Sequence, residues 1–134
     1  MSRFLRAVSL VFAAGCVGGV FNGLAGWLCG RYGISAALGV SIAPALSPGF
    51  LYQRAVWGGL WGFLFLLPML RSSVLARGIL FSLAPALVQL LVVFPYQAHK
   101  GVFGFALGTL TPVLVFVFNA VWGVAAALWV RLAK

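Results

Sequence analysis

The strongest constraint on this fold is a series of long apolar runs in a chain that contains no aspartate and no glutamate. Of its 134 residues, 64% are hydrophobic and 7% are charged, whereas about a quarter of the residues in a soluble domain are charged. Nine Lys and Arg side chains cannot form the solvated surface of a soluble domain of this size. The composition therefore predicts an integral membrane protein.

The basic residues give a net charge of +9, with the histidine neutral. They are scattered between the apolar runs and form no continuous basic patch, so the charge does not indicate nucleic-acid binding. Anionic lipid headgroups and the orientation of membrane segments explain the charge more simply. We expect membrane lipids, mainly anionic ones, as partners.

Four segments are long enough to cross the ~30 Å hydrocarbon core of a bilayer. We expect these spans at about residues 5–30, 50–70, 79–96 and 105–130, with Pro112 breaking or kinking the last one near its start. Residues 1–134 are thus predicted to form a single transmembrane domain, an all-α integral membrane four-helix bundle.

The chain begins MSRFLRAVSLVFAAGCVGG, which has the basic–apolar order of a signal peptide cleaved near Ala13 to Gly15. However, the apolar run continues to Gly30, beyond the ~7–15 apolar residues usual in such a peptide. We therefore interpret this segment as a retained transmembrane helix.

Residues 34–49 are apolar but are interrupted by Pro44 and by the pair Pro48–Gly49. A run of this length is typical of interfacial or re-entrant segments. We predict a short additional helix at about residues 34–46, between the first two spans, and the sequence leaves open whether it is interfacial or re-entrant.

The connections between spans carry the orientation signal. Six basic residues fall on one side, and three fall on the other. The first set is Arg3, Arg6, Arg71, Arg77, Arg131 and Lys134, and the second is Arg31, Arg54 and Lys100. The positive-inside rule then places both termini in the cytoplasm, and we expect a cytoplasmic (inner) membrane, bacterial in type. The second set would contact lipid headgroups or surround an outer mouth.

The first span carries a face of small residues. Gly15, Gly19 and Gly23 follow one another at a spacing of four, and Asn22 and Gly26 continue a neighbouring row. Such a GxxxG pattern favours close helix–helix packing. Gly58 and Gly62 of the second span offer a similar face, beside the bulky Trp57 and Trp61. The predicted packing residues are Gly15, Gly19, Asn22, Gly23, Gly26, Gly58 and Gly62.

Three amide side chains, Asn22, Gln89 and Asn119, are expected at membrane depth. They can hydrogen-bond to one another or to carbonyls freed by a proline such as Pro85. Alternatively, they line a polar path through the bundle. Both interpretations remain open at the level of the sequence.

A weak internal echo accompanies these features. Residues 41–46, SIAPAL, resemble residues 82–87, SLAPAL, and two further short matches follow in the same order. Internal repeats are frequent in transporter folds. However, a composition rich in Ala, Leu and Gly also produces chance matches.

Catalytic and metal-binding chemistry is not indicated. The one histidine, His99, has no carboxylate to orient it, and Cys16 and Cys29 are separated by about 20 Å on a helix. We therefore expect no enzyme activity, no cofactor and no metal site.

Two main functions remain, and lipid binding or regulation by the basic residues that face anionic headgroups is a third class. The first is a structural or accessory subunit, or scaffold, that docks small-residue helix faces against itself as a homo-oligomer or against a larger membrane complex. The alternative is a small channel or carrier for an anion or a neutral solute, lined by the intramembrane amides. A proton-coupled or cation-selective carrier is disfavoured because such sites generally use Asp or Glu.

Overall fold

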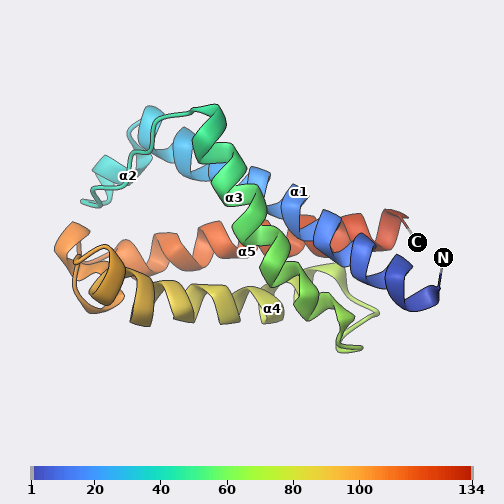
Figure 1. Ribbon diagram of the computed structural model, residues 1–134. Helices are drawn as coiled ribbons and strands as arrows, with labels where there is room; N and C mark the ends of the chain where they lie inside the picture. Colours follow the sequence, from blue (N-terminus) through green and yellow to red (C-terminus); the bar gives the residue numbers. More distant parts are fainter. Residues whose placement is uncertain (1, 134) are drawn as a thin grey trace.

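A computed structural model describes residues 2–133, and no β-strand occurs in that range. The elements are α1 (Arg3–Arg31), α2 (Ile34–Ala37), α3 (Pro48–Trp61), the 3₁₀ helix η1 (Gly62–Leu66), α4 (Val74–Val88), the π-helix η2 (Gln89–Gln97), the 3₁₀ helix η3 (Val102–Leu107) and α5 (Thr111–Ala133). Figure 1 shows α1, α4 and α5 running roughly along one long axis, with α3 crossing them and both ends of the chain at the same end of the molecule.

Three helical segments are long and apolar enough to cross a membrane: α1, the continuous α4–η2 segment Val74–Gln97, and α5. Their lengths are 29, 24 and 23 residues, and about 20 residues suffice. The prediction of an all-helical protein with membrane-spanning helices is confirmed to this extent.

Serine side chains fix where three of the helices begin. The hydroxyls of Ser2, Ser47 and Ser73 each accept a hydrogen bond of 3.1 Å from a backbone N–H in the first turn of α1, α3 and α4. These N-caps satisfy backbone donors that have no partner within the helix. The cap at Ser73 explains why the third helix begins at Val74, five residues before the predicted residue 79.

The second predicted span, residues 50–70, differs from the observed helical segment mainly at its C-terminal end. α3 begins at Pro48, where proline is favoured in the first helical turn, and passes into η1, which ends at Leu66. Leu67 is extended, as expected for a residue before proline, and Pro68 cannot continue the helix. The helical structure therefore stops four residues earlier than predicted.

The fourth predicted span, residues 105–130, begins later than expected. Phe103, Gly104 and Gly108 all have positive φ angles, so the chain from Val102 forms a short turn rather than the start of the long helix. α5 begins at Thr111, with Pro112 in its first turn. Proline costs little there because the first N–H groups of a helix have no intrahelical acceptor.

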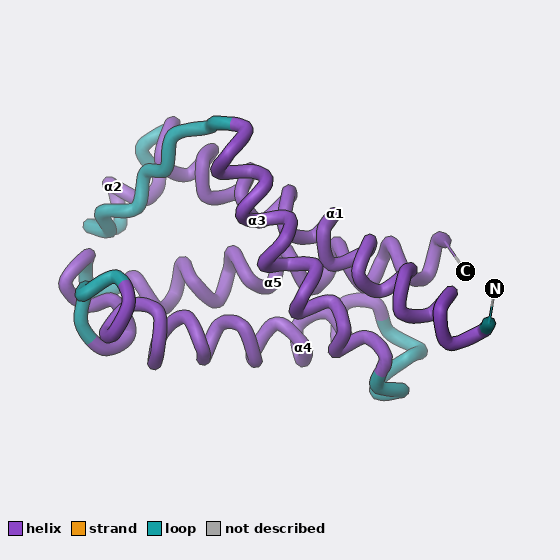
Figure 2. The backbone as a smooth tube through the Cα atoms, in the orientation of Figure 1, coloured by secondary structure: helices purple, strands orange, loops and turns teal. Residues whose placement is uncertain are grey.

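The short helix predicted at residues 34–46 is wrong in extent, because α2 covers only Ile34–Ala37. Gly39 has a φ of 71°, which ends the helix, and residues 40–47 are irregular. This stretch folds back on the end of α1: a Cβ on Gly30 would lie 2.6 Å from the Cα of Ala43. It also joins η3, since Ser41 N–H donates to the Leu107 carbonyl at 2.8 Å. Figure 2 shows it as the loop beside α2.

The sequence echo does not correspond to a structural repeat. Residues 41–46 are irregular, whereas residues 82–87 lie within α4. The two matching hexapeptides therefore adopt different backbones, and the echo carries no argument about a duplicated fold.

The core lies where α5 packs against α1 and α4. Trp122 of α5 is 2% exposed and contacts the buried ring of Phe65 from η1, with 5.8 Å between the ring centroids. The largest buried apolar cluster contains Val11, Ala14, Phe65, Phe81, Trp122, Ala126, Ala127 and Val130. α5 is therefore the central helix, and α3 reaches the core mainly through η1.

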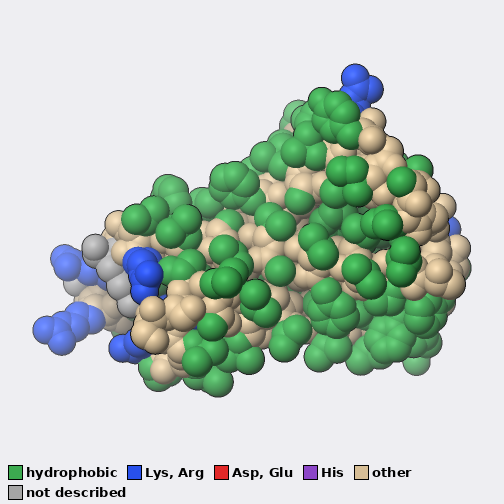
Figure 3. Space-filling model, turned by 180° about the vertical axis from the view of Figure 1, so that it is seen from behind, with side chains coloured by type: hydrophobic (Ala, Val, Ile, Leu, Met, Phe, Trp, Pro, Cys, Tyr) green, Lys and Arg blue, Asp and Glu red, His purple; other side chains and the backbone are tan. Residues whose placement is uncertain are grey.

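The surface is apolar along its middle and basic at its ends. Figure 3 shows hydrophobic side chains over most of the face in view, with Lys and Arg side chains gathered at one end and few at the other. Many large apolar side chains are exposed, including Phe4, Leu60 and Leu75. This distribution suits contact with lipid chains along the middle and with headgroups at the ends.

Candidate functional site

The small-residue faces of α1 and α3 meet within the chain. A Cβ on Gly15 would lie 2.8 Å from the Cα of Gly62, and a Cβ on Gly58 would lie 2.8 Å from the Cα of Gly19. The two backbones are therefore in direct contact over more than one helical turn. Because these four glycines face one another, they present no open strip to a second molecule.

The other predicted packing residues make looser contacts. A Cβ on Gly23 would lie 3.3 Å from the Cγ of Arg54, and one on Gly26 would meet only Pro44, at 3.8 Å. Trp57 and Trp61 line a small cavity together with Gly19 and Gly58. Their rings pack edge-to-face with centroids 5.8 Å apart, and Trp57 is 37% exposed.

Trp122 closes the junction between α1, α3 and α5, a role that the sequence did not suggest. Its indole N–H donates to the carbonyls of both Gly15 and Gly58, at 3.2 Å each. A Cβ on Gly18 would lie 2.8 Å from Cδ1 of the same indole. The sequence signal for this contact was the row of glycines in α1. Glycine spacing alone does not identify the tryptophan that packs against that row.

The three amides lie around one region of the interior. Asn119 Nδ2 donates to the Gln89 side-chain oxygen at 3.1 Å and to the Val115 carbonyl at 2.8 Å. Asn22 Nδ2 donates to the Phe118 carbonyl at 2.8 Å. Gln89 and Asn119 therefore bind each other, while Asn22 joins α1 to α5 at the adjacent residue, Phe118.

Arg54 lies beside these amides. A Cβ on Gly19 would meet the backbone carbonyl of Arg54, and Gly19 is twelve residues before the end of α1. At ~1.5 Å per residue, the backbone of Arg54 is about 18 Å along α1 from Arg31. Arg54 was expected at the outer end of the second span, and the structure places its backbone near the middle of α1.

Three adjoining cavities share Arg54 as a wall. The largest, about 330 Å³, lies between α3 and η2 and is lined by Gln53, Arg54, Trp57, Gln89, Val93, Phe94, Gln97 and Ala98. A second, about 100 Å³, adds Asn22 and Phe50 to Arg54 and Gln89. A third, about 10 Å³, contains Asn22, Arg54 and Asn119. Arg54 therefore lines all three cavities, and Asn22, Gln89 and Asn119 each line at least one of them.

The charge of Arg54 has no counter-ion among the side chains of this protein. Its guanidinium carbon lies 5.3 Å from the centroid of the Phe50 ring, a cation–π contact. The sequence contains no Asp and no Glu to pair with it. Donor groups without acidic partners make this region suited to an anion.

The remaining candidates lie apart from these cavities. Arg31 and Lys100 are exposed at the end opposite the termini, as is His99. Cys16 and Cys29 are free and half-buried. Within residues 2–133, no group of three His, Cys, Asp or Glu side chains is placed to hold a metal ion.

The fold and these cavities define a class: an all-helical protein with three membrane-length helices and an arginine that lines several small cavities. No protein-family model, curated protein or solved structure matches the chain.

Proposed function

We propose that this protein is a small channel or carrier for an anion in the cytoplasmic membrane of a bacterium, with Arg54 as the central anion-binding residue. The supporting observation is the position of Arg54, whose side chain borders three adjoining cavities together with Asn22, Gln89 and Asn119. The proposal assigns no catalytic chemistry and no cofactor to the chain.

A charge within the membrane is costly. An arginine at the centre of a membrane helix costs about 2.5–3.5 kcal/mol on insertion scales, and such residues are rare and usually functional. Arg54 lies six residues into α3, so its cost is smaller than this central value. An anion bound beside Arg54 would offset part of this cost. The amide N–H₂ group of Gln89 and the second N–H of Asn22 can add hydrogen bonds to an anion that has lost its water. Both N–H groups of Asn119 already bond to Gln89 and to the Val115 carbonyl.

Together with this function, we propose that the chain crosses the membrane four times. α3 and η1 together contain 14 and 5 residues, which at ~1.5 and ~2.0 Å per residue reach about 31 Å. That length equals the ~30 Å hydrocarbon core of a bilayer. With this segment as a fourth span, both termini lie in the cytoplasm and Arg31 and Lys100 lie outside.

The direct test is anion flux through the purified protein in liposomes, with chloride, nitrate, phosphate and acetate supplied separately. We expect the wild-type protein to carry at least one of them, and Arg54→Gln to reduce that flux at least about tenfold, which corresponds to ~1.4 kcal/mol. Arg54→Lys, which keeps the charge but loses the planar donor fork, should retain part of it.

Arg31→Gln is the matched control, since it removes the same charge at an exposed site away from the cavities. It should leave the flux near the wild-type level. Absence of flux for all four anions in the wild-type protein, or equal losses in the two glutamine variants, would contradict the proposal.

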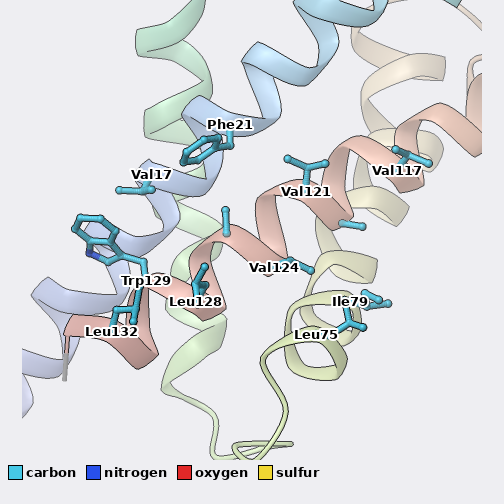
Figure 4. Close-up of a pocket in the computed structure, with 12 residues that line it drawn as sticks. Val17, Phe21, Leu75, Ile79, Val117, Val121, Val124, Leu128, Trp129 and Leu132 are labelled. Carbon is cyan, nitrogen blue, oxygen red and sulfur yellow. The ribbon is translucent and has the colours of Figure 1, made fainter. Parts of the chain in front are cut away.

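A second candidate, an accessory subunit or scaffold in an oligomer or a larger membrane complex, is favoured by a different surface. An apolar groove of about 730 Å³ lies between α1, α4 and α5. Figure 4 shows side chains of all three helices, including Phe21, Ile79 and Val121, around this groove. The GxxxG faces are occupied within the chain, so this groove is the surface to which a partner helix would bind.

Native mass spectrometry after gentle extraction tests this candidate. A larger assembly should be lost on Ala125→Trp, which fills the groove, and should persist on Leu83→Trp, an exposed position of α4 outside the groove. A wild-type protein that appears only as a lipid-bound monomer would exclude it.

A further inference from the structure

Three arginines line one small cavity at the end of the molecule where the termini lie. The cavity has a volume of about 130 Å³, and its lining residues are Arg71, Ser73, Val74, Arg77, Val130 and Arg131. They come from the loop after η1, the first turn of α4 and the last turns of α5. Elements that are far apart in sequence thus bring three positive charges to one place.

Arg77 is held rigidly at the back of this cavity. It is only 6% exposed, and its Nη2 donates to the carbonyls of Phe65 at 2.8 Å and Leu67 at 3.1 Å. Its guanidinium carbon also lies 5.3 Å from the centroid of the Phe65 ring. Its Nε is buried without a hydrogen-bond partner, so the backbone carbonyls of Phe65 and Leu67 do not satisfy all of its donors.

Arg131 is also oriented by the backbone. Its Nη2 donates to the Ser72 carbonyl at 3.0 Å, which ties the end of α5 to the loop before α4. Arg71, in the same loop, is exposed and also lines the cavity. The cavity is therefore lined by two guanidinium groups that hydrogen-bond to backbone carbonyls and by a third, exposed one.

The positive charges around this cavity favour binding of an anion. Three guanidinium groups repel one another, and the sequence provides no Asp or Glu to separate them. α4 begins at Val74, on the cavity wall, and a helix N-terminus adds about half a positive charge. Multiple arginines with planar, forked donors are the usual recognition chemistry for phosphate.

The position of the cavity suggests where such a phosphate would come from. α4 starts and α5 ends beside it, and both belong to membrane-length segments, so the cavity lies at the level of the lipid headgroups. At ~30 Å³ per water molecule, 130 Å³ equals the space of about four waters, which is enough for one phosphate group. The wall residues Val74 and Val130 add apolar surface.

We infer that Arg71, Arg77 and Arg131 form a binding site for a phosphate group, supplied by an anionic phospholipid headgroup such as that of phosphatidylglycerol. Free inorganic phosphate has the same chemistry and is the other source to be distinguished. This site is separate from the cavities around Arg54, and it does not depend on anion transport.

The test uses the full-length protein in a neutral detergent, titrated with short-chain phosphatidylglycerol, short-chain phosphatidylcholine or inorganic phosphate, with binding followed by native mass spectrometry. We expect retention of one phosphatidylglycerol by the wild-type protein. The double variant Arg71→Gln/Arg131→Gln should bind it at least about tenfold more weakly. Phosphatidylcholine should bind weakly in both, because its headgroup carries a positive charge toward the arginines.

Arg6→Gln is the matched control, because Arg6 is exposed in the early turns of α1, at the same end of the molecule, and does not line the cavity. It should leave phosphatidylglycerol binding unchanged. Arg77 is left intact in these variants since it holds the end of η1. Binding of inorganic phosphate that the double variant abolishes would support the phosphate site and assign it to free phosphate.

Two results would overturn the inference. The first is equal weakening by Arg6→Gln and the double variant, which would show that only the overall charge attracts the lipid. The second is failure of the wild-type protein to bind either phosphate compound while it remains monodisperse and helical by circular dichroism.

Discussion

Gly19 and Gly26 lie seven residues apart on the same face of α1, yet a side chain would meet very different surroundings at the two positions. A Cβ on Gly19 would meet the Arg54 carbonyl oxygen and lie 3.0 Å from the Cα of Ala55, whereas a Cβ on Gly26 would meet only Pro44, at 3.8 Å. Backbone atoms cannot turn aside as a flexible side chain can, so only the first contact forces two helices apart.

This difference predicts opposite effects for one substitution. Gly19→Ala should destabilise the protein by about 1–3 kcal/mol, the usual range for overpacking. Gly26→Ala should be neutral or stabilising, because alanine favours a helix over glycine by up to ~1 kcal/mol. Thermal unfolding in detergent, followed by circular dichroism, measures both, and equal shifts in Tm would contradict the contact between α1 and α3.

The sequence identifies the small and polar residues directly. It does not identify which of them contact one another in the folded protein. The spacing of Gly15 and Gly19 could be read directly. That Trp122 would bind the carbonyls of Gly15 and Gly58 depends on the relative rotation of three helices, which no local pattern determines. The hydrogen bonds of Arg77 to the Phe65 and Leu67 carbonyls were missed for the same reason.

At the scale of the elements, α5 connects the molecule by polar contacts as well as by burial. It provides Asn119, which donates to Gln89 at the start of η2, and the Phe118 carbonyl, which accepts from Asn22 of α1. π-helical turns are rare and frequently occur at functional sites. Here, the π-helix η2 begins at Gln89, and its first residue forms part of the cavities beside Arg54.

The contact between η2 and α5 should be measurable by a double-mutant cycle. Gln89→Leu and Asn119→Leu are expected to show a coupling free energy of about 0.6–1.7 kcal/mol, the range for interhelical hydrogen bonds in membranes. Unfolding of each variant in mixed micelles gives the four free energies. In the control cycle, Gln53→Leu with Asn119→Leu should show coupling near zero, and equal coupling in both cycles would refute a specific Gln89–Asn119 bond.

Helix existence was predictable from hydrophobicity, but helix ends depended on single residues. Pro68, Ser73 and the positive φ angles at Phe103 and Gly104 moved three boundaries by several residues. The irregular chain at residues 40–46 was mistaken for helix because it is apolar. Val40 is buried at 3% exposed, whereas Leu46 is 43% exposed, so the apolar character of this stretch does not reflect a helix packed on the core.

At the scale of the whole molecule, both chain ends lie together (Figure 1), and most arginines outside the middle lie at that same end. The positive-inside rule then makes the orientation a single testable statement. A fluorescent protein fused after the last residue should fluoresce in the cytoplasm. Alkaline phosphatase inserted in the loop at residues 99–101 should be active outside.

Two controls make this orientation experiment decisive. Moving the phosphatase to the loop at residues 68–72 should abolish its activity, and moving the fluorescent protein to residues 99–101 should abolish its fluorescence. The reverse pattern would invert the molecule, and it would place the three-arginine cavity at the outer leaflet.

The hydrogen bonds of Trp122 and Asn22 also limit the order in which the helices can pack while the chain is being synthesised. They join residues 107 and 96 positions apart in the sequence, whereas the glycine contact between α1 and α3 closes a much shorter loop and costs less chain entropy. A nascent chain halted before Thr111 could therefore already pair α1 with α3. It would still lack α5, which hydrogen-bonds to both of these helices. The fold would be completed only after the ribosome had released α5 into the membrane.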